Sequence, residues 1–284
     1  MTAFITYLVS GIAIGSSFAL VGSGFVIAHR VTRVVNMAQG SVAILGALIS
    51  YSLLQGMFPH GVAELLAVLA SALIGLLVGV IAIGKTATNP LISLIITLGI
   101  SIFCSAVIIL FWGQDPVSPP GLGGTVKFLD VGIERQRILI IAVTLITFAA
   151  LNLFLTRTFT GKGLTACASN PIAARLVGID VRRMGFVAFA VAGGLGGLAG
   201  VLIAPTSAIS FSSDLPLALS GFAAAIFGGL NSPLRTLAGG LVLGIVSQMV
   251  AGYVEGSFQT EVALAMMLAI MVLRSKDFIS EEAR

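Results

Sequence analysis

The chain has 284 residues, of which 57% are hydrophobic and only 9% are charged, and its mean hydropathy is +1.11. A soluble domain of this size does not reach such values. Backbone polar groups in lipid must be satisfied within their own segment, so the long apolar runs predict an all-α polytopic membrane protein with one transmembrane domain over residues 1–284. The net charge of +4 does not predict nucleic-acid binding, because the basic residues cluster between the apolar runs.

Apolar segments of membrane-spanning character follow one another along the chain, and we expect about eight or nine of them. The last three are less clearly bounded, and a short one could be re-entrant if it lines a protein-covered cavity. The segments are Tyr7–Ala28, Met37–Leu54, Glu64–Gly84, Leu91–Trp112, Ile138–Leu155, Phe186–Ala204, Leu215–Leu230, Leu237–Val254 and Val262–Leu273.

The distribution of Lys and Arg predicts the orientation of these segments. If the N-terminus lies outside, all but three of the 15 basic residues fall on the cytoplasmic side. The three exceptions, Lys127, Arg135 and Arg137, belong to a Pro- and Gly-rich loop over 113–137, which is then extracytoplasmic. The polar loop over 157–184 is cytoplasmic, and so is the C-terminus.

The stretch from Gly161 to Met184 is the longest polar and basic interruption of the apolar pattern. Within it, Asn170 is a helix N-cap, Pro171 suits the first helical position, and Gly178 suits the C-terminal end. The predicted helix, Pro171–Val177, is too short to cross about 30 Å of hydrocarbon at roughly 1.5 Å per residue. It therefore lies outside the membrane core.

One face of this short helix is apolar, because Ile172 and Leu176 are four residues apart. Ala173 and Val177 lie beside them, and basic residues surround the ridge: Lys162, Arg175, Arg182 and Arg183. Such a helix can dock into a groove on another protein. The alternative is a solvated connecting loop.

Two nucleotide-binding patterns occur in the chain but lack their structural context. Residues 79–86 match GxxxxGK[ST], and residues 194–199 match a dinucleotide fingerprint, yet both lie in apolar membrane segments and not in a strand–loop–helix unit. The glycine spacings instead predict close helix packing. They occur at Gly11/Gly15, Gly75/Gly79, Gly240/Gly244 and in the series Gly193, Gly196, Gly197 and Gly200.

No acidic or basic residue lies near the middle of a predicted span. Proton- or sodium-coupled carriers keep such charges, so their absence indicates that the energy comes from elsewhere. The sequence contains no nucleophile–base arrangement or paired carboxylates of an intramembrane enzyme, and its two cysteines have no metal-ligand spacing. We therefore expect neither catalysis nor a metal site.

Uncharged polar residues gather at the start of the second segment, at Asn36, Gln39 and Ser41. They could line a translocation path, or they could cap the helix and join it to a neighbour. Asp214 and Pro216 mark another helix start at the outer side. Its carboxylate could meet a substrate ammonium group, although simple capping also explains it.

The chain resembles the membrane subunits of Liv-type branched-chain amino acid ABC importers. Val35–Gly40 is similar to the family's N-F-A-H-G stretch, Ala166–Asp180 to its cytoplasmic loop, and Ala224–Pro233 to its late Gly-rich segment. The resemblance extends over nearly the whole chain. Four positions depart from it. Gln39 and Ser41 stand where the family usually has His and Glu, and Thr165 and Ser169 stand where its loop often carries Arg and an acidic residue.

The resemblance implies a permease subunit of a bacterial inner-membrane importer. Its partners would be a second permease, two cytoplasmic ATPase subunits that bind ATP and Mg²⁺, and an extracytoplasmic solute-binding protein. This chain would bind no cofactor itself. The short helix would be the coupling helix, with ATPase-coupling residues at Ala166, Asn170, Pro171, Ala173, Ala174, Arg175, Leu176 and Gly178.

The departures at Gln39 and Ser41 leave the substrate open, because permeases related to this family also move urea, short amides and small organic acids. The mechanism that the resemblance implies is alternating access driven by the ATPases. A stand-alone channel or facilitator for a small neutral solute remains the alternative, since neutral polar groups and small-residue packing suit both. A facilitator, however, has no use for the helix that begins at Pro171.

Overall fold

A computed structural model describes residues 2–56, 58–84, 90–128, 131–253 and 259–273. Six helices in this part of the chain are long and apolar enough to cross a membrane: α1 (Thr2–Thr32), α3 (Val62–Ile83), α4 (Pro90–Trp112), α5 (Arg135–Arg157), α8 (Val181–Ile203) and α10 (Pro233–Tyr253). The shorter helices are α2 (Gln39–Gln55), α6 (Phe159–Ser169), α7 (Pro171–Leu176), α9 (Asp214–Phe227) and α11 (Gln259–Leu273).

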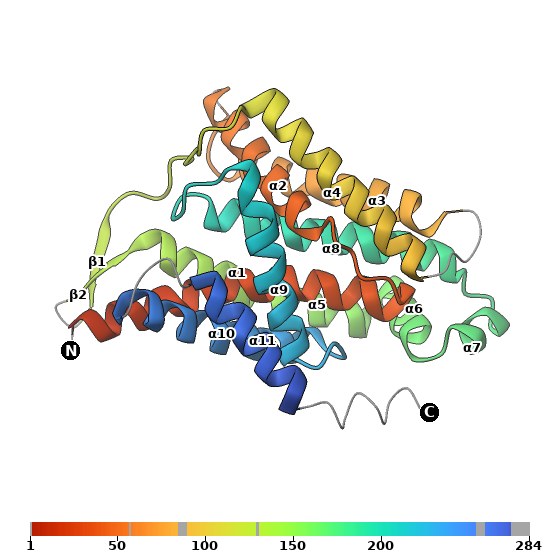
Figure 1. Cartoon of the computed structure of the whole chain (residues 1–284). Coiled ribbons are helices and arrows are strands. Elements are labelled where there is room, and N and C mark those ends of the chain that lie inside the picture. Colours follow the sequence, from red (N-terminus) through yellow and green to blue (C-terminus); the bar gives the residue numbers. More distant parts are fainter. Residues whose placement is uncertain (1, 57, 85–89, 129–130, 254–258, 274–284) are drawn as a thin grey trace.

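The all-α polytopic prediction is confirmed, and each predicted apolar segment overlaps with a helix. The count of eight or nine membrane segments is not confirmed, because only six described helices meet the length and hydropathy of a span. α2 and α9 are shorter apolar helices. In Figure 1, α9 crosses the long helices steeply where they run side by side.

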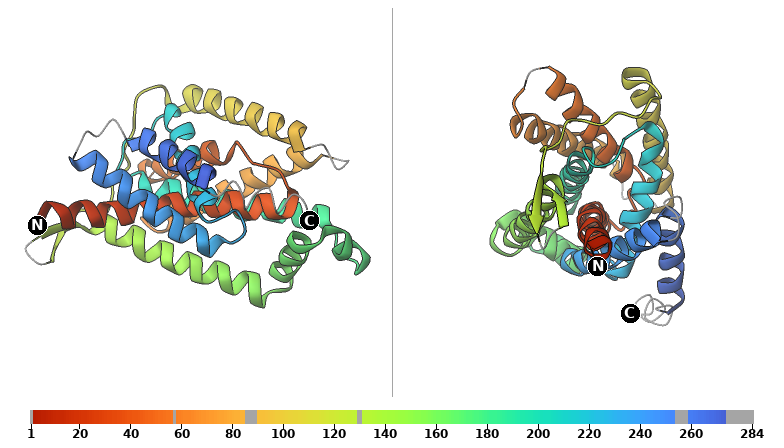
Figure 2. Two further views of the ribbon diagram at one scale, coloured as in Figure 1. Left: turned by 60° about the horizontal axis from the view of Figure 1, so that its bottom comes forward. Right: turned by 90° about the vertical axis from the view of Figure 1, so that its left-hand side faces the viewer.

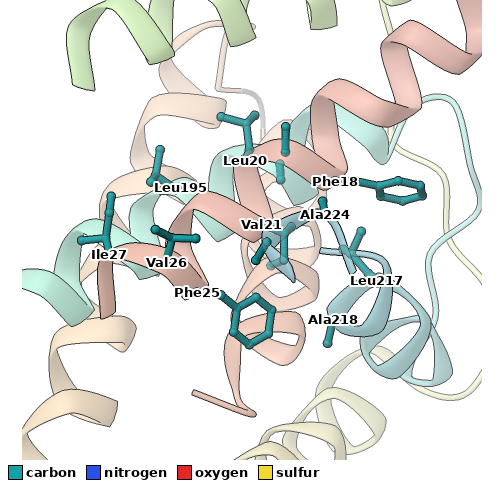
Figure 3. Packing of buried hydrophobic residues seen from close by; sticks show 14 of the residues in the cluster. Phe18, Leu20, Val21, Phe25, Val26, Ile27, Leu195, Leu217, Ala218 and Ala224 are labelled. Carbon is teal, nitrogen blue, oxygen red and sulfur yellow. The ribbon is translucent and has the colours of Figure 1, made fainter. Parts of the chain in front are cut away.

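α1 forms the centre of the bundle, and the end-on view of Figure 2 shows the other helices arranged around it. It is in contact with α8, α9 and α10. Leu20, Val21 and Val26 of α1 are fully buried. Figure 3 shows them among Leu195 of α8 and Leu217, Ala218 and Ala224 of α9. The apolar residues of α1 therefore supply much of the core. A helix at the lipid-facing perimeter would instead expose many of its apolar residues.

Glycines permit the closest helix crossings, as the spacing predicted. A Cβ atom on Gly15 of α1 would lie 2.5 Å from the carbonyl oxygen of Gly240 on α10. A Cβ atom on Gly193 of α8 would lie 2.7 Å from Cα of Gly75 on α3. Real Cβ atoms do not approach backbone so closely, so α1–α10 and α3–α8 pack with their backbones in direct contact.

Two elements inside the predicted loops were missed. The loop over 113–137 contains an antiparallel hairpin of β1 (Thr125–Phe128) and β2 (Val131–Glu134), with Thr125 opposite Glu134. The loop over 157–184 contains α6, whose N-cap Thr158 accepts a hydrogen bond from the N–H of Gly161 at 3.0 Å. Only glycine fits at position 161, because a Cβ atom on this residue would lie 2.7 Å from Cα of Leu155 on α5. A glycine required by a tight helix crossing looks, in sequence, like a helix breaker.

The two loops lie at opposite ends of the bundle. β1 and β2 lie beside the first residues of α1, and α6 and α7 lie at the other end (Figure 1). This arrangement agrees with the predicted separation of the loops on two sides of the membrane. Which end faces the cytoplasm remains a prediction. Lys85, Arg274, Lys276 and Arg284, which contributed to the predicted orientation, and the C-terminus itself lie outside the described residues.

Candidate coupling and translocation site

α7 is a short capped helix in contact with α6 and with α8, and both predicted caps are confirmed. The Asn170 side-chain oxygen accepts hydrogen bonds from the backbone N–H groups of Ile172 and Ala173, each at 3.0 Å. At the other end Gly178 has a φ of 86°, and its N–H donates to the carbonyl of Arg175. The N–H of Ile179 donates to Ala174, which completes a Schellman motif.

The predicted apolar ridge of α7 is exposed. Ile172, Leu176 and Val177 are 70%, 84% and 76% exposed. Three large apolar side chains on one short helix are an unusual surface for solvent. Asn170, Ala173, Arg175 and Gly178 are also exposed, whereas Pro171 and Ala166 are half-buried.

Ala174 does not share this exposed surface. It is only 3% exposed and packs into the core that includes Leu164 and Cys167 of α6. Its expected role as a docking contact therefore needs correction. Ala174 faces inward because residues 172 and 176 occupy the outer face of the helix, and position 174 lies on the opposite side. Its contribution is to attach α7 to α6.

A cavity of about 610 Å³ lies between α7 and the bundle. It is lined by the turn after α1, the end of α3 and the first residues of α8, and it includes Arg33, Arg175 and Arg182. Asp180 also lines it and caps α8 by accepting from the N–H groups of Arg182 and Arg183 at 3.0 and 3.1 Å. Residues of four long helices, α1, α3, α4 and α8, line this cavity together with Pro171 and Arg175 of α7.

Asn36 and Gln39 are brought together at the start of α2. Both are buried, at 1% and 0% exposure, and the Asn36 amide donates to Gln39 Oε1 at 3.3 Å. The Gln39 amide in turn donates to the backbone carbonyl of Ala192 on α8 at 2.7 Å. Asn36 Oδ1 accepts from the N–H of Ala38 at 3.2 Å. In this conformation the pair ties the start of α2 to α8.

Ser41 belongs to a different cluster, whose other members lie far from it in the sequence. Its hydroxyl donates to Asp214 Oδ2 of α9 at 2.9 Å, and its oxygen is 2.7 Å from that of Ser101 on α4. Ser105, one turn further along α4, donates to the same Asp214 oxygen at 3.0 Å. The i, i+4 spacing of Ser101 and Ser105 could have indicated this cluster, because it places two hydroxyl groups on one face of the helix.

Asp214 is the first residue of α9 and not its N-cap, which is Ser213. Oδ1 accepts from the N–H of Leu215 at 2.7 Å, and Oδ2 accepts from the two serines. The carboxylate thus joins three helices. An ionisable group inside a membrane bundle with dedicated hydroxyl partners is a candidate functional group.

A cavity of about 340 Å³ lies between α1, α2, the end of α8 and the start of α9, and Asp214 is not among its lining residues. Apolar residues such as Phe18, Ile44 and Leu217 line it together with the hydroxyl residues Ser207, Ser212, Ser213 and Ser220. Its volume is within the range of small-molecule sites. Asn36, Gln39 and Ser41 are not among its lining residues. The described residues contain no group of three or more His, Cys, Asp or Glu that could hold a metal ion.

Long apolar helices, close glycine crossings, a cavity with hydroxyl groups and an exposed apolar ridge define a multi-pass membrane transport subunit. The chain belongs to the family "Branched-chain amino acid transport system / permease component", which matches residues 7–274. It is therefore the permease component of an ABC-type importer and not an enzyme, since ATP hydrolysis in this class lies in partner subunits.

The relatives include amino acid and sugar permeases. The chain is 25% identical to the high-affinity branched-chain amino acid permease LivH of Salmonella typhimurium, over 95% of this chain and 93% of the relative. It is 26% identical to BraD of Pseudomonas aeruginosa, over 95% and 94%. It is 23% identical to the ribose import permease RbsC of Haemophilus influenzae, over 92% and 80%.

Among solved structures, the chain is similar to one in the complex of PsaBC from Streptococcus pneumoniae with Fab. The TM-score is 0.53 at 13% identity, with 94% of this chain and 90% of the other covered. At this identity the likeness concerns the fold alone. It indicates that the arrangement of helices around α1 is a shared architecture.

Proposed function

We propose that this chain forms one half of the membrane path of an importer for branched-chain amino acids, and that α7 is the coupling helix on which an ATPase subunit docks. The observation that carries the proposal is the exposed ridge of Ile172, Leu176 and Val177 on a doubly capped helix. An apolar surface of this kind is complementary to a groove on a partner.

The substrate proposal rests on the relatives and on the cavity at α9. LivH and BraD, at 25% and 26% identity over 95% of the chain, are branched-chain amino acid permeases. Phe18, Ile44 and Leu217 offer contact to an aliphatic side chain, and Ser213 and Ser220 offer hydrogen bonds. The Asp214 carboxylate does not line the cavity and is bonded to Ser41 and Ser105, but it could meet the ammonium group of a solute if α2 and α4 move away from it. Related small polar solutes, such as amides or sugars, are the competing substrate class.

The mechanism proposed is alternating access. Two ATPase subunits with ATP and Mg²⁺ would close on each other and move the coupling helices of two permease subunits. α7 would transmit this motion through Ala174 to α6, and through the cavity-lining residues Arg175 and Asp180 to α8. We expect the bundle end with α7 to face the cytoplasm of a bacterium, and the N-terminus to lie outside.

Asn36, Gln39 and Ser41 are proposed as part of the translocation path. All three are buried in the conformation described, and their hydrogen bonds join α2 to α8, α4 and α9. A helix that moves during alternating access must exchange such bonds. The polar groups would then be uncovered when α2 separates from its neighbours.

The experiment is purification of the tagged chain from native membranes, identification of the copurifying subunits, and reconstitution of the complex in liposomes. We expect an ATP-binding subunit and a second permease, and leucine uptake that requires ATP and a solute-binding protein. Uptake of ribose or urea in place of leucine would contradict the proposal that the substrate is a branched-chain amino acid. Passage of small solutes through the chain alone, without ATP, would reject the importer in favour of a facilitator.

A further inference from the structure

Another cavity, of about 430 Å³, lies at the same end of the bundle as α7. It is formed by the ends of α1 and α5, by α6 and by the turn before α10. It contains two cationic side chains, Arg30 of α1 and Lys162 of α6. It shares no residue with the cavity beneath α7 or with the cavity between α1, α2, α8 and α9.

The charge of this cavity is unbalanced. None of the described residues that line it is a carboxylate, and the side chains of Arg30 and Lys162 form no ion pair within the described part of the chain. Arg30 is half-buried, so part of its guanidinium surface is withdrawn from water. Cationic groups that converge without a counter-ion form a site for an anion.

The remaining lining residues divide into two kinds. Asn152 and Ser232 carry an amide and a hydroxyl that can donate hydrogen bonds to phosphate oxygens, whereas the hydroxyls of Thr156 and Thr165 donate to backbone carbonyls of their own helices. Phe148, Leu151 and Leu155 form an apolar wall along α5. Because one cavity offers both kinds of surface, the ligand that fits it is amphipathic.

The apolar wall belongs to a helix that also presents apolar side chains outward. Leu145, Ile146 and Leu153 of α5 are 53%, 67% and 59% exposed, and α5 is one of the helices able to cross the membrane. A ligand with its anionic group beside Arg30 could therefore lay hydrocarbon chains along α5. Basic pockets between membrane helices bind phospholipid headgroups in this way.

We propose that the cavity bounded by Arg30 and Lys162 binds the phosphate headgroup of an anionic phospholipid. Lys162 belongs to α6, which carries α7, and Arg30 belongs to the central helix α1. A headgroup held between them would fasten the coupling segment to the core of the bundle. The proposal concerns a lipid ligand and does not depend on which solute is transported.

The test uses the purified full chain in neutral detergent and native mass spectrometry with phosphatidylglycerol and phosphatidylcholine of identical acyl chains. We expect phosphatidylglycerol to bind more tightly. Each near-surface cation contributes about a fivefold change in affinity, so the Arg30→Gln/Lys162→Gln double variant should bind it roughly thirtyfold more weakly. The charge-preserving double variant Arg30→Lys/Lys162→Arg should retain most of the affinity.

The matched control is Arg157→Gln/Arg235→Gln, which removes the same charge from two exposed residues that do not line the cavity. It should bind phosphatidylglycerol like the wild type. If Arg30→Gln prevents folding, the single variant Lys162→Gln should still weaken binding about fivefold, because Lys162 is exposed.

Three results would overturn the proposal. Equal affinity for the two lipids would show no preference for an anion, and equal weakening in both double variants would show only a general charge effect. Inorganic phosphate that displaces phosphatidylglycerol at equal concentration would identify a site for free phosphate and not for a lipid. A wild-type preference that only the cavity variants abolish would support the lipid site.

Discussion

The hydroxyl of Ser41 on α2 donates a hydrogen bond of 2.9 Å to the carboxylate of Asp214 on α9. α2 and α9 are shorter apolar helices, and this hydrogen bond joins them across a sequence separation of 173 residues. Ser105 of α4 donates to the same oxygen. Asp214 is therefore a structural junction as well as a candidate contact for the solute.

Neutralising this junction should weaken the bundle and reduce transport. Asp214→Asn keeps the shape of the side chain but removes the charge that strengthens both hydrogen bonds, and we expect a loss of about 1–2 kcal/mol in the free energy of unfolding. Thermal unfolding in detergent and leucine uptake in liposomes measure the two effects. Asp115→Asn, at an exposed loop residue, is the control. Unchanged stability and uptake in Asp214→Asn would contradict both roles.

The two faces of α7 should respond differently to a carboxylate. Leu176→Asp places the charge on the exposed ridge, so we expect the bundle to remain folded and ligand-stimulated ATPase activity of the complex to fall at least about tenfold. Ala174→Asp buries a charge against α6 and should destabilise the chain by several kcal/mol. Normal ATPase stimulation in Leu176→Asp would show that the exposed ridge of α7 is not part of the docking surface.

Adjacent glycines of α8 provide a test of backbone packing. A Cβ atom on Gly193 would lie 2.5 Å from the carbonyl oxygen of Ser71, whereas on Gly194 it would lie 3.5 Å from the nearest atom, Cβ of Ala72. Gly193→Ala should therefore destabilise the bundle by roughly 1–3 kcal/mol, while Gly194→Ala should not. Thermal unfolding of the two variants measures the difference, and equal stabilities would show that α3 and α8 can separate without cost.

Much of this fold could be predicted from the sequence. Apolar runs predict membrane helices because lipid permits few other structures. The glycine spacings that include Gly15 and Gly193 predict close helix crossings, because small residues let two helix backbones approach each other. α6 was missed although its N-cap Thr158 is a local signal, because the need for Gly161 comes from its close contact with Leu155 of α5, which the sequence does not show. The β1–β2 hairpin lies in four-residue strands, too short for a clear alternation.

The site was predictable where it depends on neighbouring residues. The caps at Asn170 and Gly178 involve bonds within a few positions, so their chemistry is visible in sequence. The partners of Ser41 lie 60 and 173 residues away, and only the folded bundle brings them together. For the same reason the inward orientation of Ala174 depends on where α6 lies, and the residue types alone do not reveal it.

The N-cap of α7 should be measurable in isolation. Asn170→Ala removes the acceptor for two backbone N–H groups and should cost the helix about 1 kcal/mol, whereas Asn170→Ser should retain most of it. Hydrogen exchange of the Ile172 and Ala173 amides should accelerate about fivefold in the alanine variant. Identical exchange rates in Asn170→Ala and Asn170→Ser would indicate that tertiary contacts alone hold α7.

Both native cysteines are buried, which allows a new cysteine to report on docking. Cys104 and Cys167 are 6% and 1% exposed, and burial raises the pKa of the Cys167 thiol, so less of the reactive thiolate is present near neutral pH. Leu176→Cys, at a position that is 84% exposed, should therefore react much faster with a maleimide than either native residue.

The most direct measurement of the central claim is the rate of maleimide labelling of Leu176→Cys in the isolated chain and in the complex with its ATPase subunits. If α7 is the coupling helix, the complex should label at least about tenfold more slowly, because a docked partner covers the ridge. Gln114→Cys, at an exposed residue of the loop that contains β1 and β2, should label equally in both. Equal labelling of Leu176→Cys with and without the ATPase subunits would contradict the account.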